Sequence, residues 1–154
     1  MNDSTKNPEV DGINSGNCRV FLAAMMERDG LGFPKVAKAI GCSQKTLERV
    51  LAGATKPAPE MIKQVGIMAA LTFPRYRKLS QADKEKISEK IGAIGGGTLG
   101  FAGIAAAISV SGTVAGLSGA GIVAGLAALG QIVRGGMLAG VGVAAAIPIA
   151  AGAL

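Results

Sequence analysis

The side chains that could bind a partner are mainly lysines and arginines in the first half of the chain. Residues 18–78 contain eleven Lys or Arg residues against four Asp or Glu residues. Such a balance favours an anionic partner, either nucleic acid or an anionic lipid surface. The charge balance alone does not distinguish these two partners.

Catalytic chemistry is poorly represented in the chain. There is no histidine, the acidic residues are scattered, and the glycine runs lack the Lys-Ser/Thr pair of a phosphate-binding loop. Cys18 and Cys42 are the only cysteines, and without histidine they supply neither a zinc-ligand set nor a disulfide framework. We therefore expect no enzyme activity, no metal, no cofactor, no small-molecule substrate and two reduced thiols.

Apolar residues at helical spacing predict four short helices in the basic half. In chain order they cover about residues 20–29, 33–40, 44–51 and 61–71. Pro34 suits a first helical turn, Gly41 suits a left-handed C-terminal position, and Ser43 can cap the third helix through its hydroxyl. A capping box at residues 80–83 predicts another helix that continues to Lys90.

Residues 33–51 have the order of a helix-turn-helix, with Gly41-Cys42-Ser43 as the turn. The stretch FPKVAKAIGCSQKTLERVLAGATKPAPEMIKQV, residues 33–65, resembles the phage-repressor and Cro-like helix-turn-helix family. The resemblance includes the small residue Ala37, the turn Gly41 and the trailing Gly53…Lys56-Pro57…Pro59 pattern, and it extends over about residues 20–72.

This resemblance implies that the recognition helix begins near Ser43 and enters a major groove. The residues expected at the bases are Ser43, Gln44, Lys45, Thr46 and Arg49, and those expected near phosphates are Lys35, Lys38, Lys56 and Lys63. Glutamine can recognise adenine and arginine can recognise guanine there. The alternative is a helical interaction module whose charges form only a solvated face.

The last 64 residues carry a single charge, Arg134, and seventeen of the 24 glycines. Uncharged stretches of this length predict membrane spans, which we place at about residues 91–110, 113–133 and 135–154. The basic flank before residue 91 would then stay cytoplasmic, at a bacterial inner membrane. The alternative is a cytoplasmic assembly in which many copies pack these helices into a water-excluded core.

Glycines spaced by four predict close helix association in this segment, as in a glycine zipper. The candidate helix-packing residues are Gly92, Gly96, Gly100, Gly112, Gly116, Gly121, Gly125, Gly136 and Gly140. We therefore expect a homo-oligomer, with membrane lipid as a further partner and DNA as the third.

The segment GTVAGLSGAGIVAGLAALG followed by GGMLAG, residues 112–140, resembles the glycine-rich core of the small interferon-inducible membrane proteins of animals. That resemblance implies an organelle or plasma-membrane protein that perturbs membrane integrity or cell survival.

Together these patterns predict an all-α chain of four regions. They are a flexible arm (1–17), a helix-turn-helix domain of four to five helices (18–74), a basic linker helix (75–90) and a glycine-rich hydrophobic hairpin or three-helix membrane segment (91–154). The leading expectation is a membrane-anchored, self-associating DNA-binding regulator. The alternatives are a membrane-active effector of a defence or killing system, with the first half as its sensor, and a self-assembling structural protein.

Overall fold

The computed structural model describes residues 12–93, 97–114, 116 and 118–138, and side-chain surroundings through residue 133. This part of the chain is mostly helical, in agreement with the expected all-α class. Its elements are β1 (Gly12–Asn14), α2 (Cys18–Asp29), α3 (Phe33–Ile40), α4 (Gln44–Leu51), α5 (Pro59–Leu71), α6 (Phe73–Tyr76), α7 (Gln81–Ile91), β2 (Thr98–Gly100), α8 (Phe101–Ser111) and α9 (Gly119–Leu138).

The four helices expected in the basic half are confirmed as α2 to α5, and local residues explain their ends. Gly30 and Gly41 terminate α2 and α3 with φ of 66° and 93°, in the left-handed region that glycine adopts without strain. The predicted capping box of α7 is also confirmed, because Ser80 accepts from the backbone N–H of Asp83 and the Asp83 carboxylate accepts from that of Ser80.

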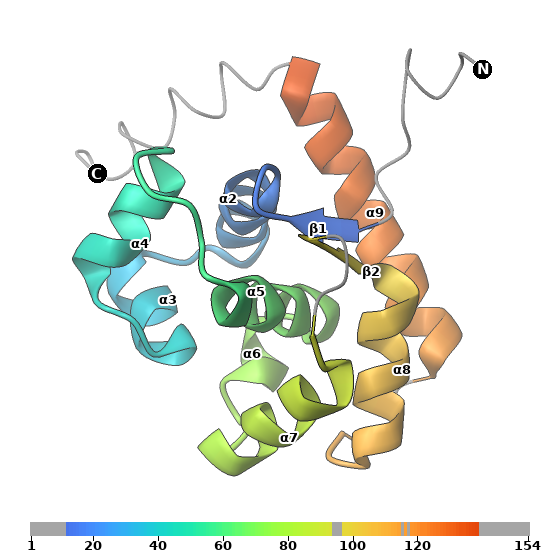
Figure 1. Ribbon diagram of the computed structural model, residues 1–154. Helices are drawn as coiled ribbons and strands as arrows, with labels where there is room; N and C mark the ends of the chain where they lie inside the picture. The colour runs from blue at the N-terminus through green and yellow to red at the C-terminus, as the bar shows by residue number, and fades with distance from the viewer. Residues whose placement is uncertain (1–11, 94–96, 115, 117, 139–154) are drawn as a thin grey trace.

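The helices α2 and α5 lie at the centre of the molecule (Figure 1). The α3–α4 pair lies on one side of α2 and α5, and α8 and α9 lie on the other. α4 packs against α2, α3 packs against α5, and α9 packs against α2, α5 and α8. The α3–α4 pair and the glycine-rich helices are therefore supported by the same two central helices.

The hydrophobic core is continuous across the expected boundary at residue 90. A single cluster of buried side chains extends from Ile13 to Val133 and includes residues of both halves. The rings of Phe21 in α2 and Phe101 in α8 meet edge to face, with centroids 5.9 Å apart. The helices after residue 100 thus pack on the basic half, whereas the sequence-based prediction makes residues 91–154 a separate segment.

A short two-stranded antiparallel pair corrects the expectation of a flexible arm up to residue 17. Ile13 pairs with Leu99, and both side chains are buried. Gly12 faces Gly100, and a Cβ at Gly12 would lie 2.8 Å from the carbonyl oxygen of Leu99. Residues 12–14 escape sequence-based prediction because three residues containing a glycine give no alternation of apolar and polar residues. Residues 1–11 lie outside the described chain.

A short helix that was not predicted precedes the linker helix, which begins after the Ser80 cap as expected. Residues 73–76 form α6, and the chain then turns into α7. Tyr76 is fully buried, and its hydroxyl donates to the side-chain oxygen of Gln64 over 2.6 Å. This segment is therefore part of the packed molecule.

The expected helix over residues 91–110 is wrong, because β2 interrupts it and α8 begins only at Phe101. The expected second span begins later than residue 113, since α9 starts at Gly119. The third, 135–154, lies mostly outside the described residues. Among the helices that the structure describes, none has both the length and the hydropathy needed to cross a bilayer.

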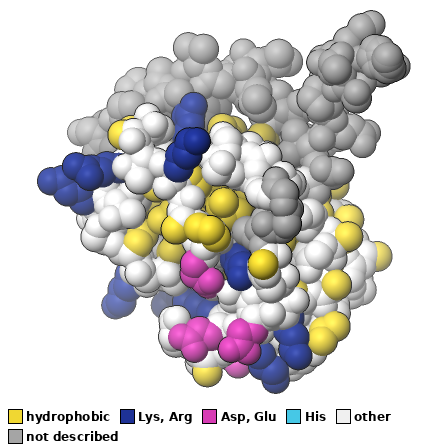
Figure 2. Space-filling view, in the orientation of Figure 1, with side chains coloured by type: hydrophobic (Ala, Val, Ile, Leu, Met, Phe, Trp, Pro, Cys, Tyr) yellow, Lys and Arg dark blue, Asp and Glu magenta, His cyan; other side chains and the backbone are white. Residues whose placement is uncertain are grey.

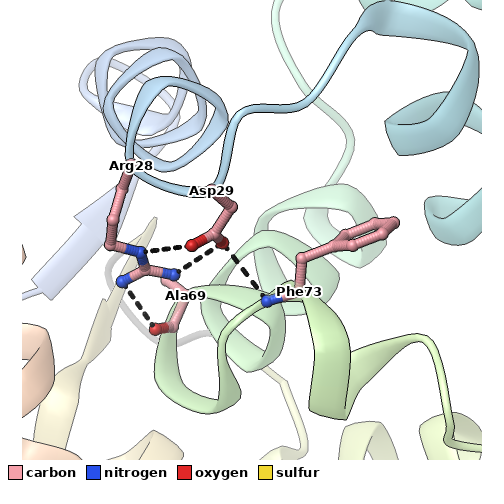
Figure 3. Close-up of polar contacts among 4 residues, drawn as sticks. All are labelled: Arg28, Asp29, Ala69 and Phe73. Carbon is pink, nitrogen blue, oxygen red and sulfur yellow. Dashed lines mark hydrogen bonds and ion pairs between the residues drawn. The ribbon is translucent and has the colours of Figure 1, made fainter.

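Arg28 and Asp29 connect the end of α2 to the corner between α5 and α6 (Figure 3). The Arg28 guanidinium donates to both carboxylate oxygens of Asp29 over 3.0 Å and to the carbonyl oxygen of Ala69 over 3.5 Å. The Asp29 carboxylate also accepts from the backbone N–H of Phe73, the first residue of α6. The corner residue Thr72 has φ of 71°, which is strained for a β-branched side chain. These contacts hold that corner in place.

Candidate nucleic-acid interface

The helix α4 has one buried side and one charged, exposed side. Leu47, Val50 and Leu51 are buried, and their spacing places them on the side that faces the core. Four of the five side chains expected at the bases lie on the exposed part of this helix: Gln44, Lys45, Thr46 and Arg49. The structure therefore brings these residues together on one accessible surface.

Ser43 forms the predicted N-terminal cap of α4. Its hydroxyl oxygen accepts from the backbone N–H of Thr46 over 3.0 Å, and it donates to the Thr46 hydroxyl over 2.8 Å. This cap satisfies one of the free N–H groups at the start of the helix. The first turn of α4, which carries Gln44 and Lys45, is thereby fixed in helical geometry.

Glu48 lies on this surface as well, and its contact with Gln44 was not predicted. It is exposed on α4, and its carboxylate accepts a hydrogen bond of 3.1 Å from the side-chain amide of Gln44. The spacing of four residues was a signal that could have found this pair, because residues four apart are neighbours on a helix.

The side chains expected near phosphates surround α4. Lys35 and Lys38 are exposed on α3, Lys56 is exposed in the segment after α4, and Lys63 is partly exposed on α5. Figure 2 shows Lys and Arg side chains along the left edge of the molecule, where α3 and α4 lie. Because these cations are not buried, they can approach a polyanion without a large desolvation cost.

Arg19 adds a cation that was not predicted for this surface. It belongs to α2 and is partly exposed, and its Nε lies 3.7 Å from the position that a Cβ would take at Gly53. Gly53 follows α4, so the packing of α2 against α4 brings Arg19 beside the C-terminal end of that helix. Sequence separation hides this neighbour, since only the tertiary fold places the two segments together.

The buried side chain of Lys84 supports the C-terminal end of α3. Lys84 of α7 is 9% exposed, its ammonium donates to the carbonyl oxygen of Ala39 over 2.9 Å, and it lies 4.4 Å from the centroid of the Tyr76 ring. A cation is favourable at a helix C-terminus, where carbonyl groups lack helical partners. Desolvation by burial lowers the pKa of Lys84. This side chain therefore ties α7 to the α3–α4 pair.

Cys18 and Cys42 are both free thiols. Burial raises the pKa of Cys18 to about 12, and it also raises the pKa of Cys42 above its ordinary value. Both groups stay protonated near neutral pH and are poor nucleophiles. Within the described chain, no group of three or more Cys, Asp or Glu residues could hold a metal ion.

Five of the nine predicted helix-packing glycines make no close contact with another helix among the described residues. At Gly92, Gly112, Gly116 and Gly125 an added Cβ would meet no described atom within 4 Å, outside its own helix or chain neighbours. At Gly121 the nearest atom is the Ser118 hydroxyl, 3.1 Å away. Gly100 pairs in β2, Gly136 belongs to α9, and Gly96 and Gly140 lie outside the described residues. A role of these residues between copies stays a prediction.

One close contact between helices that depends on a glycine was not predicted. A Cβ at Gly66 in α5 would lie 2.9 Å from the terminal methyl of Ile104 in α8 and 3.2 Å from Leu99. Gly66 therefore allows α8 and β2 to approach α5 closely.

No protein-family model, curated protein or solved structure matches the chain. The functional argument therefore depends on the geometry of the site and on the residue patterns themselves.

Proposed function

We propose that this chain is a DNA-binding regulator that inserts α4, as the recognition helix of a helix-turn-helix, into the major groove of duplex DNA. An α-helix fits that groove, and arginine, lysine and glutamine side chains can form paired hydrogen bonds with base edges. In this proposal Arg49, Lys45 and Gln44 contact bases, while Lys35, Lys38 and Lys56 contact phosphates.

The observation that carries this proposal is the division of α4 into two sides. Its apolar residues are committed to the core, so its polar and cationic residues are left on a surface flanked by further cations. Sequence-independent phosphate contacts would supply affinity, and the exposed side of α4 would supply specificity.

Selection of duplexes from a randomised pool by the full chain tests the proposal. We expect a defined consensus, and we expect Arg49→Ala to weaken binding to it by on the order of tenfold or more while relaxing one position of the site. Lys86→Ala is the matched control, because it removes an exposed cation two residues from Lys84 and therefore on the opposite side of α7 from the contact with α3. Equal effects of the two variants, or no consensus at all, would reject this function.

Association of copies is the second part of the proposal, since a single module of this kind usually needs a second half-site to bind tightly. The outer side of α9 supports it. Small exposed residues cover that side, and Ile132 is 52% exposed there. They are Ala120, Gly121, Ala124, Gly125 and Ala128.

Sedimentation of the full chain tests association. We expect a dimer or a larger closed oligomer that Gly125→Leu weakens and that Ala106→Leu, on the exposed side of α8, leaves unchanged. A monomer at every concentration would remove association from the proposal.

Membrane attachment through residues 91–154 is the second candidate, and its support is the single charge in that segment. Fractionation of cells that express the full chain provides the test. Recovery with membranes is expected if attachment is correct, and a chain found only in the soluble pool contradicts it. Leakage of anionic vesicles on addition of the chain would favour a membrane-active effector over a regulator.

A further inference from the structure

Glu48 is the one acidic residue of α4, a helix whose exposed side is otherwise neutral or cationic. It lies among the cations that would face DNA, where a carboxylate is repelled by phosphates. Its contact with the neighbouring Gln44 amide is defined, with Nε2 of Gln44 donating to Oε2 of Glu48 over 3.1 Å. The same turn of helix is fixed by the Ser43 cap.

The geometry of this pair leaves Gln44 able to recognise a base. A glutamine amide has two N–H hydrogens and one carbonyl oxygen. When the hydrogen remote from the oxygen is donated to Glu48, the other hydrogen and the oxygen remain together on the open edge of the amide. Adenine presents N7 as acceptor and its N6 amino group as donor in the major groove, which matches this open edge.

We propose that Glu48 is a positioning residue that holds the Gln44 amide for adenine, so that the preferred ligand is duplex DNA with an A·T pair facing the first turn of α4. This inference rests on the proposed function. Holding the amide in one orientation removes rotamer freedom before binding, so less freedom is lost in the complex. The Glu48 carboxylate lowers the affinity for non-specific DNA, because phosphates repel it, and raises the selectivity at one base pair, because it orients the Gln44 amide.

Two substitutions of Glu48 separate positioning from charge. Glu48→Ala and Glu48→Gln both remove the negative charge, but only glutamine retains a side-chain oxygen that can accept from Gln44. Gln81 and Glu85 on α7 offer a matched control, because Nε2 of Gln81 donates to Glu85 over 3.3 Å with the same spacing and both residues are exposed. Glu85→Ala therefore removes an equivalent pair away from the interface.

The experiment is selection of randomised duplexes by each full-length variant, followed by binding titrations on the consensus and on single-base changes. In the unsubstituted chain we expect adenine at one position to be preferred on the order of tenfold. Gln44→Ala and Glu48→Ala should lose this preference at that position alone. Glu48→Gln and Glu85→Ala should retain it, and both Glu48 variants should bind non-specific DNA more tightly.

The outcomes distinguish this inference from the proposed function. If the full chain selects no sequence, the proposed function fails and the inference fails with it. If a consensus is found and Glu48→Ala keeps the adenine preference, only the positioning role is overturned. Loss of the preference in Glu48→Gln as well as in Glu48→Ala would also overturn it, because the charge and not the accepting oxygen would then be responsible.

Discussion

Gly66 shows how a single residue joins the two halves of the chain. We expect Gly66→Leu to lower the free energy of unfolding by about 1–3 kcal/mol, because added atoms would be forced into the fully buried Ile104 and the nearby Leu99. Chemical denaturation measures this change. Gly103→Ala is the control, since Gly103 in α8 is exposed and an added methyl would meet nothing within 4 Å. It should raise stability by up to about 1 kcal/mol. An unchanged stability of Gly66→Leu would show that α8 does not pack on α5 in this way.

The cysteines provide a second prediction at the residue scale. A raised thiol pKa means that less thiolate is present at any given pH, and the thiolate is the species that reacts with disulfide reagents. At pH 7 to 8 we therefore expect slow labelling of the partly exposed Cys42 and none of the buried Cys18 in the native chain. Both should react in denaturant. Rapid native labelling of Cys18 would contradict its buried place at the start of α2.

The capped helix α4 is the element on which the site depends. Ser43→Ala removes the hydroxyl that accepts from the Thr46 N–H, and we expect the free energy of unfolding to fall by about 1 kcal/mol. DNA affinity should fall as well, because the first turn of α4 would be less ordered before binding. Ser43→Asp retains an accepting oxygen and should preserve stability. A loss of stability equal in both variants would exclude capping as the cause.

The elements of the basic half were predictable because their signals are local. Proline at the start of α3, glycine at its end and serine before α4 each act within a few residues, and the sequence places them correctly. The exposed position of the polar residues on α4 was predictable as well, because the helical spacing of its apolar residues shows which side is buried. The pairing of β1 with β2 was not predictable, since its partners Ile13 and Leu99 are 86 residues apart and apolar alternation is missing. Arg19 and Lys84 were missed as supports of the site for the same reason.

The helices after residue 100 posed a different problem. Long uncharged runs of alanine, glycine and isoleucine satisfy the pattern of a membrane span, of an oligomer interface and of a buried core helix equally well. In the structure six of their larger residues face the core, while Val110 and Ile132 are exposed. The six buried residues are Ile104, Ile108, Ile122, Leu126, Leu129 and Val133. Most of the exposed residues of α8 and α9 are alanine, glycine or serine, although Ala105, Ala107 and Ser111 are buried. The sequence could predict the division of each helix into two sides, but not which partner covers the larger residues.

At the scale of the whole molecule, a continuous core predicts that the basic half is unstable alone. A chain ending at Lys90 would lose the six aliphatic residues buried in α8 and α9. Burial of each contributes about 1.5–3 kcal/mol, and a domain has only about 5–15 kcal/mol of net stability. We therefore expect residues 1–90 to lack a cooperative unfolding transition by circular dichroism. A cooperative transition matching the full chain would show that the two halves fold independently.

Amide hydrogen exchange of the full chain, with and without duplex DNA, tests the central claim that the exposed side of α4 contacts DNA while α8 and α9 form part of the same folded unit. Without DNA, we predict that the slowest amides of α5 and α8 exchange through one common opening reaction. With DNA, exchange should slow from Ser43 through α4 and at Lys56, and remain unchanged over α8 and α9. Slowing confined to α8 and α9, or no slowing in any segment, would contradict the account.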